Sequence, residues 1–256
     1  METVTKPHPS CDQITRKLEF PDPCSAIWLH GNIDESSVGV RWIKQRRMQS
    51  RIFGHARLEL AERGCEGIQL RSIAQNCDIS VQTIYNLIGD RFEVIMRSAE
   101  EWVTALGRAA LDRASSGDIS VVLSILGTFW CAPLRSRGFV SNATECAMMR
   151  DSALNSVFRE HAVRLVTDSL RELRNANDLR ANVHIPSLAR QLVATVQMGI
   201  YDWTLSSGDD PSAYWSEFEH GPALMLRASA CGAETTRIES TLQLVRESRD
   251  DGTTHH

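Results

Sequence analysis

Side chains that can form several hydrogen bonds gather in the short segment SVQTIYN, residues 80–86. Gln82 and Asn86 each carry a donor next to an acceptor, and Thr83 and Tyr85 carry hydroxyl groups. Paired amide groups can bind the hydrogen-bonding edge of adenine, and hydroxyl groups suit phosphates or base edges. The segment therefore predicts recognition of a partner through hydrogen bonds.

A helix is needed to present these side chains together. Ser80 is a typical N-cap residue and predicts a helix over residues 81–88. Ile84 and Ile88 are four residues apart and share a face with Ile79, which lies just before the helix. That apolar face would pack on neighbouring helices and leave the polar side chains outside. A plain solvent-exposed surface helix is the alternative interpretation.

Two earlier helices are expected to support this one. Apolar residues spaced for one buried face, followed by RGCEG, predict a first helix over residues 40–63. A second, shorter helix is predicted over residues 70–77, and DIS then forms a tight turn. Two short helices joined by a tight turn, the second with a polar free face, suit insertion into the major groove of DNA.

Charge is distributed unevenly along the 256 residues. The formal net charge is −4, which alone gives no reason to expect nucleic acid. Residues 41–58 nevertheless lack acids and carry a run of basic residues: Arg41, Lys44, Arg46, Arg47, Arg51 and Arg57. Residues 41–51 of this run either reach the DNA backbone or minor groove as an arm, or only solubilise the first helix.

Several features keep their order and spacing between residues 52 and 102. An apolar helix ends in a glycine-rich turn, and the pair Ile73 and Ala74 follows it. Next come Ser80 after an isoleucine, Tyr85 in the third helix, and the basic Arg91 near the start of a long helix. In these features the segment resembles the N-terminal domain of TetR-family transcriptional regulators.

The resemblance implies an all-α fold with three parts. These are a three-helix helix-turn-helix DNA-binding domain, a long fourth helix, and a C-terminal helical domain for ligand binding and dimerisation. It implies a cytoplasmic homodimer that binds a double-stranded DNA operator specifically. It further implies a repressor that is released from its operator by a small apolar ligand. A helical interaction protein of the same fold that has lost specific DNA binding is the alternative.

The family pattern is not kept everywhere. Asp78 stands where the family usually has glycine in the turn, although aspartate tolerates the left-handed conformation better than most residues. Gln69 replaces a threonine that would cap the second helix better. Ile88 replaces an aromatic residue, and Arg91 replaces a lysine. Asn86 and Leu87 replace a larger aromatic residue and a histidine, so the DNA sequence that is bound would be unusual.

The resemblance also implies which residues contact DNA. Val81, Gln82 and Thr83 are expected to face the bases. Tyr85, Asn86 and Arg91 are expected to contact phosphates or both phosphates and bases. Arg71, early in the second helix, is a further phosphate candidate. Simple exposure to solvent is the alternative for each of them.

Four segments are predicted along the chain. Residues 1–39 form an N-terminal arm, 40–92 the DNA-binding domain, 93–247 the ligand-binding and dimerisation domain, and 248–256 a polar tail. The arm is expected to be disordered because proline is scattered among polar residues. Its His8, Cys11, Cys24 and His30 have spacings that suggest zinc, but their order differs from that of a zinc finger, so no metal site is expected.

Helical periodicity continues through the remainder of the chain. Helices are predicted over residues 90–114, 119–130 (stopped before Pro133), 142–149, 151–175, 186–205, 211–231 and 234–247. In the resembling family, two C-terminal helices pack on their copies in a twofold interface. The apolar residues expected there are Leu188, Leu192, Val196, Gly199, Trp203, Tyr214, Phe218, Leu224 and Leu226. Ordinary core packing is the alternative explanation of the same stripe.

A ligand cavity between helices is a further expectation. Aromatic and methionine side chains suit an apolar small molecule. The candidates are Trp102, Phe129, Trp130, Met148, Met149, Phe158, Met198 and Tyr201, which plain core packing could also explain.

Other classes of protein find little support in the sequence. It contains no H-E-x-x-H, no glycine-rich phosphate loop and no G-x-S-x-G, so an enzyme is not expected. The motifs also predict no cofactor. The seven cysteines are an odd number without close pairs, and the chain begins without an apolar signal segment, which predicts reduced thiols in an intracellular protein. No apolar stretch approaches the length of a membrane span.

Overall fold

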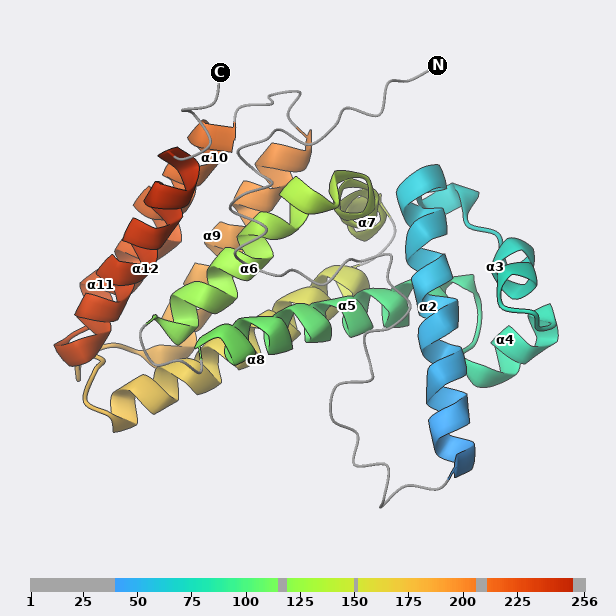
Figure 1. Cartoon of the computed structure of the whole chain (residues 1–256), viewed down its shortest axis with the longest axis horizontal. Coiled ribbons are helices and arrows are strands. Elements are labelled where there is room, and N and C mark those ends of the chain that lie inside the picture. Colours follow the sequence, from blue (N-terminus) through green and yellow to red (C-terminus); the bar gives the residue numbers. More distant parts are fainter. Residues whose placement is uncertain (1–39, 115–118, 150–151, 206–210, 251–256) are drawn as a thin grey trace. The chain divides into compact units, whose positions relative to one another are not determined.

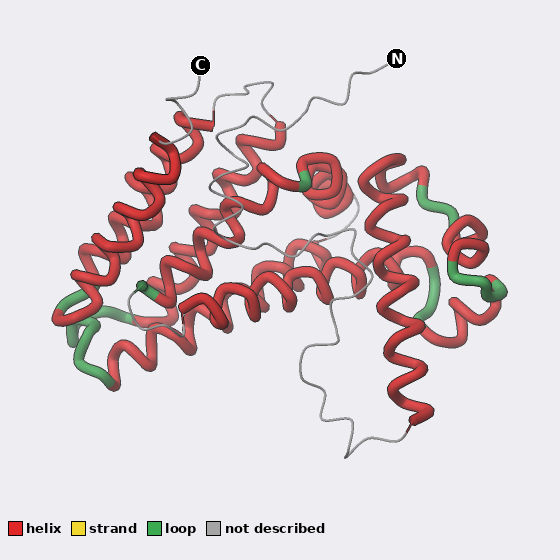
Figure 2. The backbone as a smooth tube through the Cα atoms, in the orientation of Figure 1, coloured by secondary structure: helices red, strands yellow, loops and turns green. Residues whose placement is uncertain are grey.

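The structure is a computed structural model that describes residues 40–114, 119–149, 152–205 and 211–250. Within these residues the secondary structure is helical and no strand is present (Figures 1 and 2). The prediction of an all-α fold is therefore confirmed. The predicted N-terminal arm, its histidines and cysteines, and most of the polar tail lie outside the described residues. None of the described helices is long and apolar enough to cross a membrane.

One compact unit contains the helices at the N-terminal end of the described chain. It is formed by α2 (Val40–Gly67), α3 (Leu70–Asn76), α4 (Val81–Leu87), the first part of α5 (Arg91–Ala114) and most of α7 (Arg137–Met149). The helices α2, α3 and α4 contact one another, and their packing buries Ile52, Leu60, Ile73 and Ile84 almost completely. We refer to this unit as the N-terminal unit.

The second compact unit is formed by the later helices. It contains the end of α5, α6 (Val121–Arg135), most of α8 (Ser152–Asn175), α9 (Ile185–Leu205), α10 (Pro211–Phe218), the π-helix η1 (Glu219–Ala223), α11 (Leu224–Ser229) and α12 (Gly232–Asp250). Helices α6 and α9 pack side by side, and α10 and η1 pack on α9. We refer to this unit as the C-terminal unit.

Aromatic side chains stack within the largely aliphatic core of the C-terminal unit. The ring of Trp130 on α6 stacks on Tyr214 of α10 with a centroid distance of 4.3 Å, and it lies 5.4 Å from the ring of Phe218. Tyr214 donates its hydroxyl to the carbonyl of Trp130 at 2.9 Å. Burial raises the pKa of the Tyr214 hydroxyl, which therefore stays protonated as a donor. These contacts join α6 to α10.

A buried polar group also joins α12 to the start of α6. The carboxylate of Glu234 is fully buried, accepts from the hydroxyl of Ser120, and pairs with Arg237 at 3.3 Å. Arg237 also pairs with Asp178 at 3.0 Å. Desolvation by burial raises the pKa of Glu234, although the hydrogen bonds from Ser120 and Arg237 oppose that shift.

Three of the helix predictions need correction. Helix α6 continues through Pro133 to Arg135, because a proline near the C-terminal end removes only one backbone donor from the helix. The segment 211–231 is divided into α10, η1 and α11, with Pro222 inside the π-helix. The helix predicted over residues 142–149 begins earlier, at Arg137. The predicted end of the first helix at residue 63 agrees with the break at Gly64, whose φ is +69°, although a short piece continues to Gly67.

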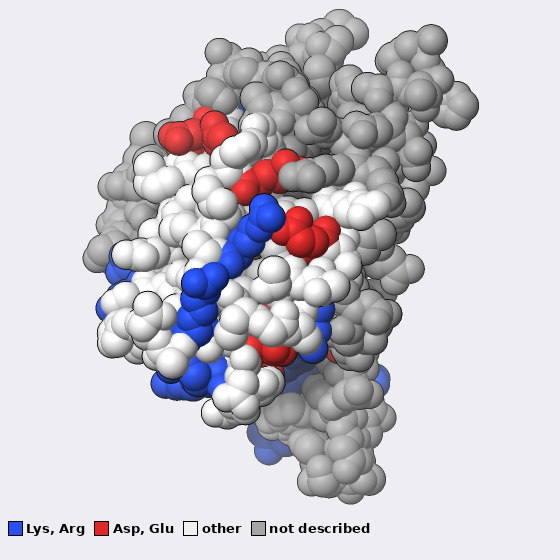
Figure 3. Space-filling view, turned by 90° about the vertical axis from the view of Figure 1, so that its left-hand side faces the viewer, with Lys and Arg blue, Asp and Glu red and all other residues white. Residues whose placement is uncertain are grey.

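Charged side chains of the two signs are interspersed on the face drawn in Figure 3. They stand among a larger area of uncharged residues. The surface ion pairs include Arg227 with Glu239 at 2.8 Å and Arg171 with Asp168 at 2.8 Å. Such pairs cancel local charge at the surface.

Candidate nucleic-acid interface

Helix α4 begins with the cap that the sequence predicts. The side chain of Ser80 accepts from the backbone N–H of Thr83 at 3.1 Å, and the two hydroxyl groups lie 2.9 Å apart. By contrast, Gln69 makes no side-chain capping bond at the start of α3. The difference agrees with the preference for serine over glutamine at N-caps.

The turn before α4 requires the left-handed conformation. Asp78 has a φ of +55°, a region in which short polar residues are tolerated better than others. The chain is held on both sides of it, because Cys77 and Ile79 each donate their backbone N–H to the carbonyl of Ala74. Asp78 therefore adopts the left-handed conformation that this turn requires.

The two faces of α4 differ as the sequence predicts. Ile84 is fully buried and Ile88, its C-cap, is nearly so. On the opposite face Gln82 and Asn86 are exposed, and Tyr85 is 49% exposed. Val81 and Thr83 are half-buried at the start of the helix. The helix therefore offers amide and phenol groups to a partner.

Two of the exposed amide side chains are already paired with each other. Gln82 donates from its side-chain nitrogen to the side-chain oxygen of Asn86 at 3.1 Å, one helical turn away. This bond orients both amides along the free face and leaves part of their hydrogen-bonding capacity for a partner.

The helix is fixed to α2 at its C-terminal end. The side chain of Gln49 donates to the carbonyl of Leu87 at 3.0 Å, one of the carbonyls that a helix end leaves without an intrahelical donor. Arg51 on α2 lies 4.0 Å from the exposed carboxylate of Asp78. Helix α2 thus positions α4 through a bond at one end and a weak ion pair at the other.

Most of the basic run on α2 is exposed, with one exception. Arg41, Lys44, Arg46, Arg47 and Arg51 are exposed. Arg57 is fully buried, and its guanidinium donates to Glu101 and to the carbonyl of Ser98, both at 2.8 Å. Arg57 therefore adds no charge to the exposed basic run. Burial also lowers the pKa of His55 on the same helix, and Arg51 lowers it further.

The remaining DNA candidates are placed as follows. Arg71 is exposed on α3. Arg91 is half-exposed at the start of α5 and is already engaged, since it donates to the carbonyl of Glu66 at 3.3 Å and lies 3.8 Å from the Glu66 carboxylate. A phosphate would have to compete with Glu66 for this arginine.

A groove beside the N-terminal half of α2 was not expected from the sequence. It has a volume of about 240 Å³ and is lined by Trp42, Gln45, Arg46, Gln49 and Arg97. The guanidinium of Arg46 lies 5.1 Å from the centre of the Trp42 ring, a cation–π arrangement. The spacing of residues 42, 45, 46 and 49 could have indicated that their side chains lie together, because these positions share one face of a helix.

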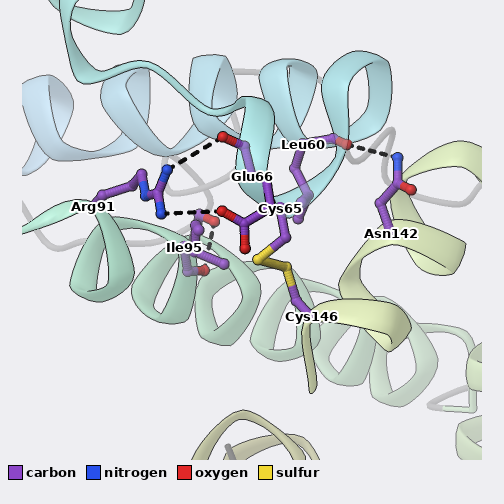
Figure 4. The surroundings of a disulfide bond; sticks show 8 residues. Leu60, Cys65, Glu66, Arg91, Ile95, Asn142 and Cys146 are labelled. Atoms are coloured by element: carbon purple, nitrogen blue, oxygen red, sulfur yellow. Dashed lines mark hydrogen bonds and ion pairs between the residues drawn. A yellow bond between two sulfur atoms is a disulfide. The ribbon is translucent and has the colours of Figure 1, made fainter. Parts of the chain in front are cut away.

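The prediction that all cysteines are reduced is wrong for two of them. Cys65, near the end of α2, and Cys146 on α7 form a disulfide with a Cα–Cα distance of 5.6 Å (Figure 4). The 80 residues that separate them in sequence hide the pair, because a spacing pattern cannot reveal a contact made by folding. Cys77 and Cys131 are buried and form no disulfide, and Cys231, which also forms none, is half-exposed.

Most of the predicted dimer stripe is buried inside the C-terminal unit itself. Leu192, Phe218 and Leu226 are at most 1% exposed, and Leu188, Val196 and Tyr214 are also buried. Gly199 is buried and Trp203 is half-buried. The buried side chains of this set cannot contact a second copy without opening the core, so core packing explains them. Leu224 is the exception, with 52% of its surface exposed.

The predicted cavity residues are divided between the two units. Phe129, Trp130, Met198 and Tyr201 belong to the C-terminal unit and Trp102 to the N-terminal unit. Met198 is 56% exposed, so it lines no enclosed space. The side chains of Met148, Met149 and Phe158 lie outside the described residues. Among the described residues, the buried indole N–H groups of Trp102 and Trp130 have no hydrogen-bond partner.

The fold is similar to that of solved transcriptional regulators. Thermus thermophilus FadR, a TetR-family transcriptional repressor solved with lauroyl-CoA, has 18% sequence identity and a TM-score of 0.55 over 70% of this chain and 93% of its own. RolR, solved with resorcinol, has 17% identity and a TM-score of 0.55 over 80% of this chain and 96% of its own. A Rhodococcus protein assigned to the TetR family has 14% identity and a TM-score of 0.55 over 68% of this chain and 95% of its own.

The chain therefore has the fold of TetR-family transcriptional regulators. No protein-family model matches the sequence, and no curated protein matches it.

Proposed function

We propose that this protein is a TetR-family regulator that binds a double-stranded DNA operator through α4. The observation that carries the proposal is the geometry of α3, the turn at Asp78 and α4. The turn and the Ser80 cap fix α4, Ile84 anchors it, and Gln82, Tyr85 and Asn86 stand on its free face. A capped helix that packs by one face and offers amides on the other suits the major groove.

Basic side chains on α2 would add affinity without sequence preference. Arg46 and Arg47 are exposed on α2, whose residues 49 and 51 contact the α4 region. Contacts between arginine or lysine and phosphates release counterions, so they make binding depend steeply on salt. The groove that contains Trp42 and Arg46 would lie beside the DNA backbone.

A homodimer follows from the size of one recognition helix. Helix α4 has 7 residues and offers too few base contacts for specific binding by one copy. Met198 on α9 and Leu224 on α11 are large apolar side chains exposed on the C-terminal unit, and we assign them to the interface between copies. The buried stripe beneath them would hold these helices in position.

Regulation by a small apolar ligand completes the proposal. RolR and FadR were solved with resorcinol and lauroyl-CoA, respectively. In this chain the indole N–H of Trp130 lies among aromatic rings without a partner in the described residues. An apolar ligand with one hydrogen-bond acceptor would suit it. Such a ligand would favour a dimer shape that fits DNA less well, and repression would end.

The experiment that tests DNA recognition selects duplexes from a random pool with the purified protein. The selected duplex is then titrated against salt with wild type, Tyr85→Ala and Tyr85→Phe. We expect one shared sequence motif, steep salt dependence and loss of specific binding in Tyr85→Ala. Tyr85→Phe keeps the aromatic ring and removes only the hydroxyl, so it distinguishes the contribution of the ring from that of the hydroxyl. Enrichment of no motif by a folded wild type would contradict the proposal and favour an interaction protein of the same fold.

The dimer is tested separately by sedimentation. Leu224→Glu and Met198→Glu should shift the protein toward monomer, because a buried charge in an interface is costly. Leu111→Glu is the matched control, since Leu111 is also an exposed leucine but lies on α5. A dimer that survives both interface substitutions would place the interface elsewhere.

A further inference from the structure

One face of α7 holds the end of α2 at three points. Gly138, Asn142 and Cys146 are spaced four residues apart and therefore lie along one face of the helix. A Cβ on Gly138 would stand 3.2 Å from the carbonyl oxygen of Ala61, so glycine permits the close approach. Asn142 donates its side-chain amide to the carbonyl oxygen of Leu60 at 2.8 Å (Figure 4) and to that of Ala61 at 3.2 Å. Cys146 forms the disulfide with Cys65.

The disulfide acts on a different segment from the other two contacts. Asn142 and Gly138 hold residues before the break at Gly64, whose φ is +69°. Cys65 lies after the break, in the short piece that ends at Gly67. A positive φ at a glycine allows the chain to change direction there. The covalent bond therefore restrains the piece of α2 beyond the break.

That piece also carries the partner of Arg91. Glu66 follows Cys65 directly, and both its carbonyl and its carboxylate contact the Arg91 guanidinium (Figure 4). The carboxylate of Glu66 is 71% exposed, and an exposed pair of this kind is weak by itself. A restraint on Cys65 keeps Glu66 in place and so strengthens its hold on Arg91.

We propose that Cys65 and Cys146 form a reversible thiol–disulfide pair that senses hydroperoxides, and that its oxidised form weakens DNA binding by keeping Arg91 on Glu66. The effect on DNA rests on the function proposed above. In the reduced form the piece beyond Gly64 is released, and Arg91 becomes available to a phosphate.

The reaction balances with a hydroperoxide as oxidant. The Cys65 thiolate, which is partly exposed, attacks the terminal oxygen of ROOH. The O–O bond breaks, RO⁻ leaves and takes a proton, and Cys65 becomes a sulfenic acid. The thiolate of Cys146, only 4% exposed, then attacks the Cys65 sulfur, the S–S bond forms, and hydroxide leaves as water. The two sulfurs lose two electrons to the peroxide, and an external dithiol reverses the change by exchange.

The positions of the two cysteines allow the disulfide to form and to be reduced with little movement of the backbone. The Cα atoms of Cys65 and Cys146 are 5.6 Å apart, within the usual range for a disulfide. Asn142 and Gly138 keep α7 against α2 whether or not the sulfurs are joined. The two thiols of the reduced form therefore remain close enough to react again.

The test compares one wild-type protein in two redox states. The full chain is reduced with a dithiol, freed of it, and divided into a sample treated with hydrogen peroxide and an untreated sample. Peptide mapping by mass spectrometry identifies the disulfide, and amide hydrogen exchange follows residues 64–69. A duplex selected from a random pool by the reduced protein reports affinity. We expect a Cys65–Cys146 peptide, slower exchange at residues 64–69, affinity about tenfold weaker and a salt slope smaller by about one.

Substitutions separate this pair from the other thiols. Cys65→Ser and Cys146→Ser should bind DNA like the reduced wild type with and without peroxide. Cys231→Ser is the matched control, because Cys231 is also free to react at the surface, and it should respond like wild type. If either serine variant fails to fold, the wild-type comparison still decides.

Three outcomes have distinct meanings. Absence of the Cys65–Cys146 peptide after peroxide treatment would overturn the proposal. A disulfide that leaves DNA affinity unchanged in a protein that binds DNA would overturn it too. A disulfide that forms reversibly and slows exchange in a protein that binds no DNA in either state would overturn the function proposed above while supporting the redox pair.

Discussion

The ring of Trp130 on α6 fills the space beside Gly199 on α9, where a Cβ would collide with it. The two helices pack closely at this point because one contributes the largest side chain and the other contributes none. Gly199 belongs to the stripe that the sequence assigned to a dimer interface. Its role in the structure is to admit Trp130 to the core of the same chain.

Replacement of Gly199 by alanine should therefore destabilise the protein. We expect Gly199→Ala to lower the free energy of unfolding by about 1–3 kcal/mol through overpacking. Gly127→Ala on α6 is the matched control, since its Cβ would lie 3.6 Å from Phe218, an ordinary contact. That variant should gain about 0.5–1 kcal/mol from helix propensity. Urea denaturation measures both, and equal effects of the two variants would contradict the assignment of Gly199 to the core.

Loss of an exposed amide on α4 should relax DNA specificity. Gln82→Ala removes a side chain that can pair with a base edge, and we expect specific affinity to fall by about 1–3 kcal/mol while nonspecific affinity is unchanged. Binding to the selected duplex and to its single-base variants measures the difference. Gln191→Ala, at an exposed glutamine on α9, should have no effect. Equal losses for all duplexes would mean that Gln82 contacts no base.

The buried pair of Arg57 and Glu101 should depend on both partners. Arg57→Met leaves the Glu101 carboxylate buried without its guanidinium, and we expect a loss of about 3–5 kcal/mol in the free energy of unfolding. The double variant Arg57→Met, Glu101→Met removes both charges and should recover most of that loss. Chemical denaturation of the two single variants and the double variant forms a complete cycle. Additive losses would show that the two residues do not interact.

Stability should fall with rising pH through the titration of Glu234. Burial raises the pKa of this carboxyl in the folded protein above its ordinary value of 4.5, so the folded state binds the proton more tightly than the unfolded state. Its contribution is complete below pH 4.5 and is lost as pH rises toward the raised pKa. Glu234→Gln cannot titrate. The free energy of unfolding of wild type relative to this variant should therefore decrease from pH 4.5 upward, as measured by urea denaturation. A constant difference across that range would contradict the shift.

Local signals in the sequence were sufficient for α3, the turn and α4. The Ser80 cap, the left-handed Asp78 and the buried Ile84 are each decided by neighbours a few residues away, and the structure confirms all three. The helical periodicity also predicted the all-α fold. The DNA contacts themselves stay a prediction, because exposure on α4 shows which side chains are available and not what they bind.

Contacts between distant residues could not be predicted in the same way. Arg57 stands in a run of basic residues, yet it is buried and paired with Glu101. Leu192 belongs to a stripe with the spacing expected of an interface, yet it lies in the core. A stripe of apolar residues specifies that a face is buried, whereas the packing of the whole chain specifies what covers it. The disulfide depends on α7 reaching the end of α2.

The sequence by itself determined the helices, their caps and the polar free face of α4, because these follow from interactions within a few residues. Only the tertiary structure decided that Cys65 meets Cys146, that Arg91 rests on Glu66, and that Trp130 occupies the place beside Gly199. Each of these pairs brings together residues that are 25 or more positions apart. Their proximity is set by the packing of helices and has no signature in the order of residues.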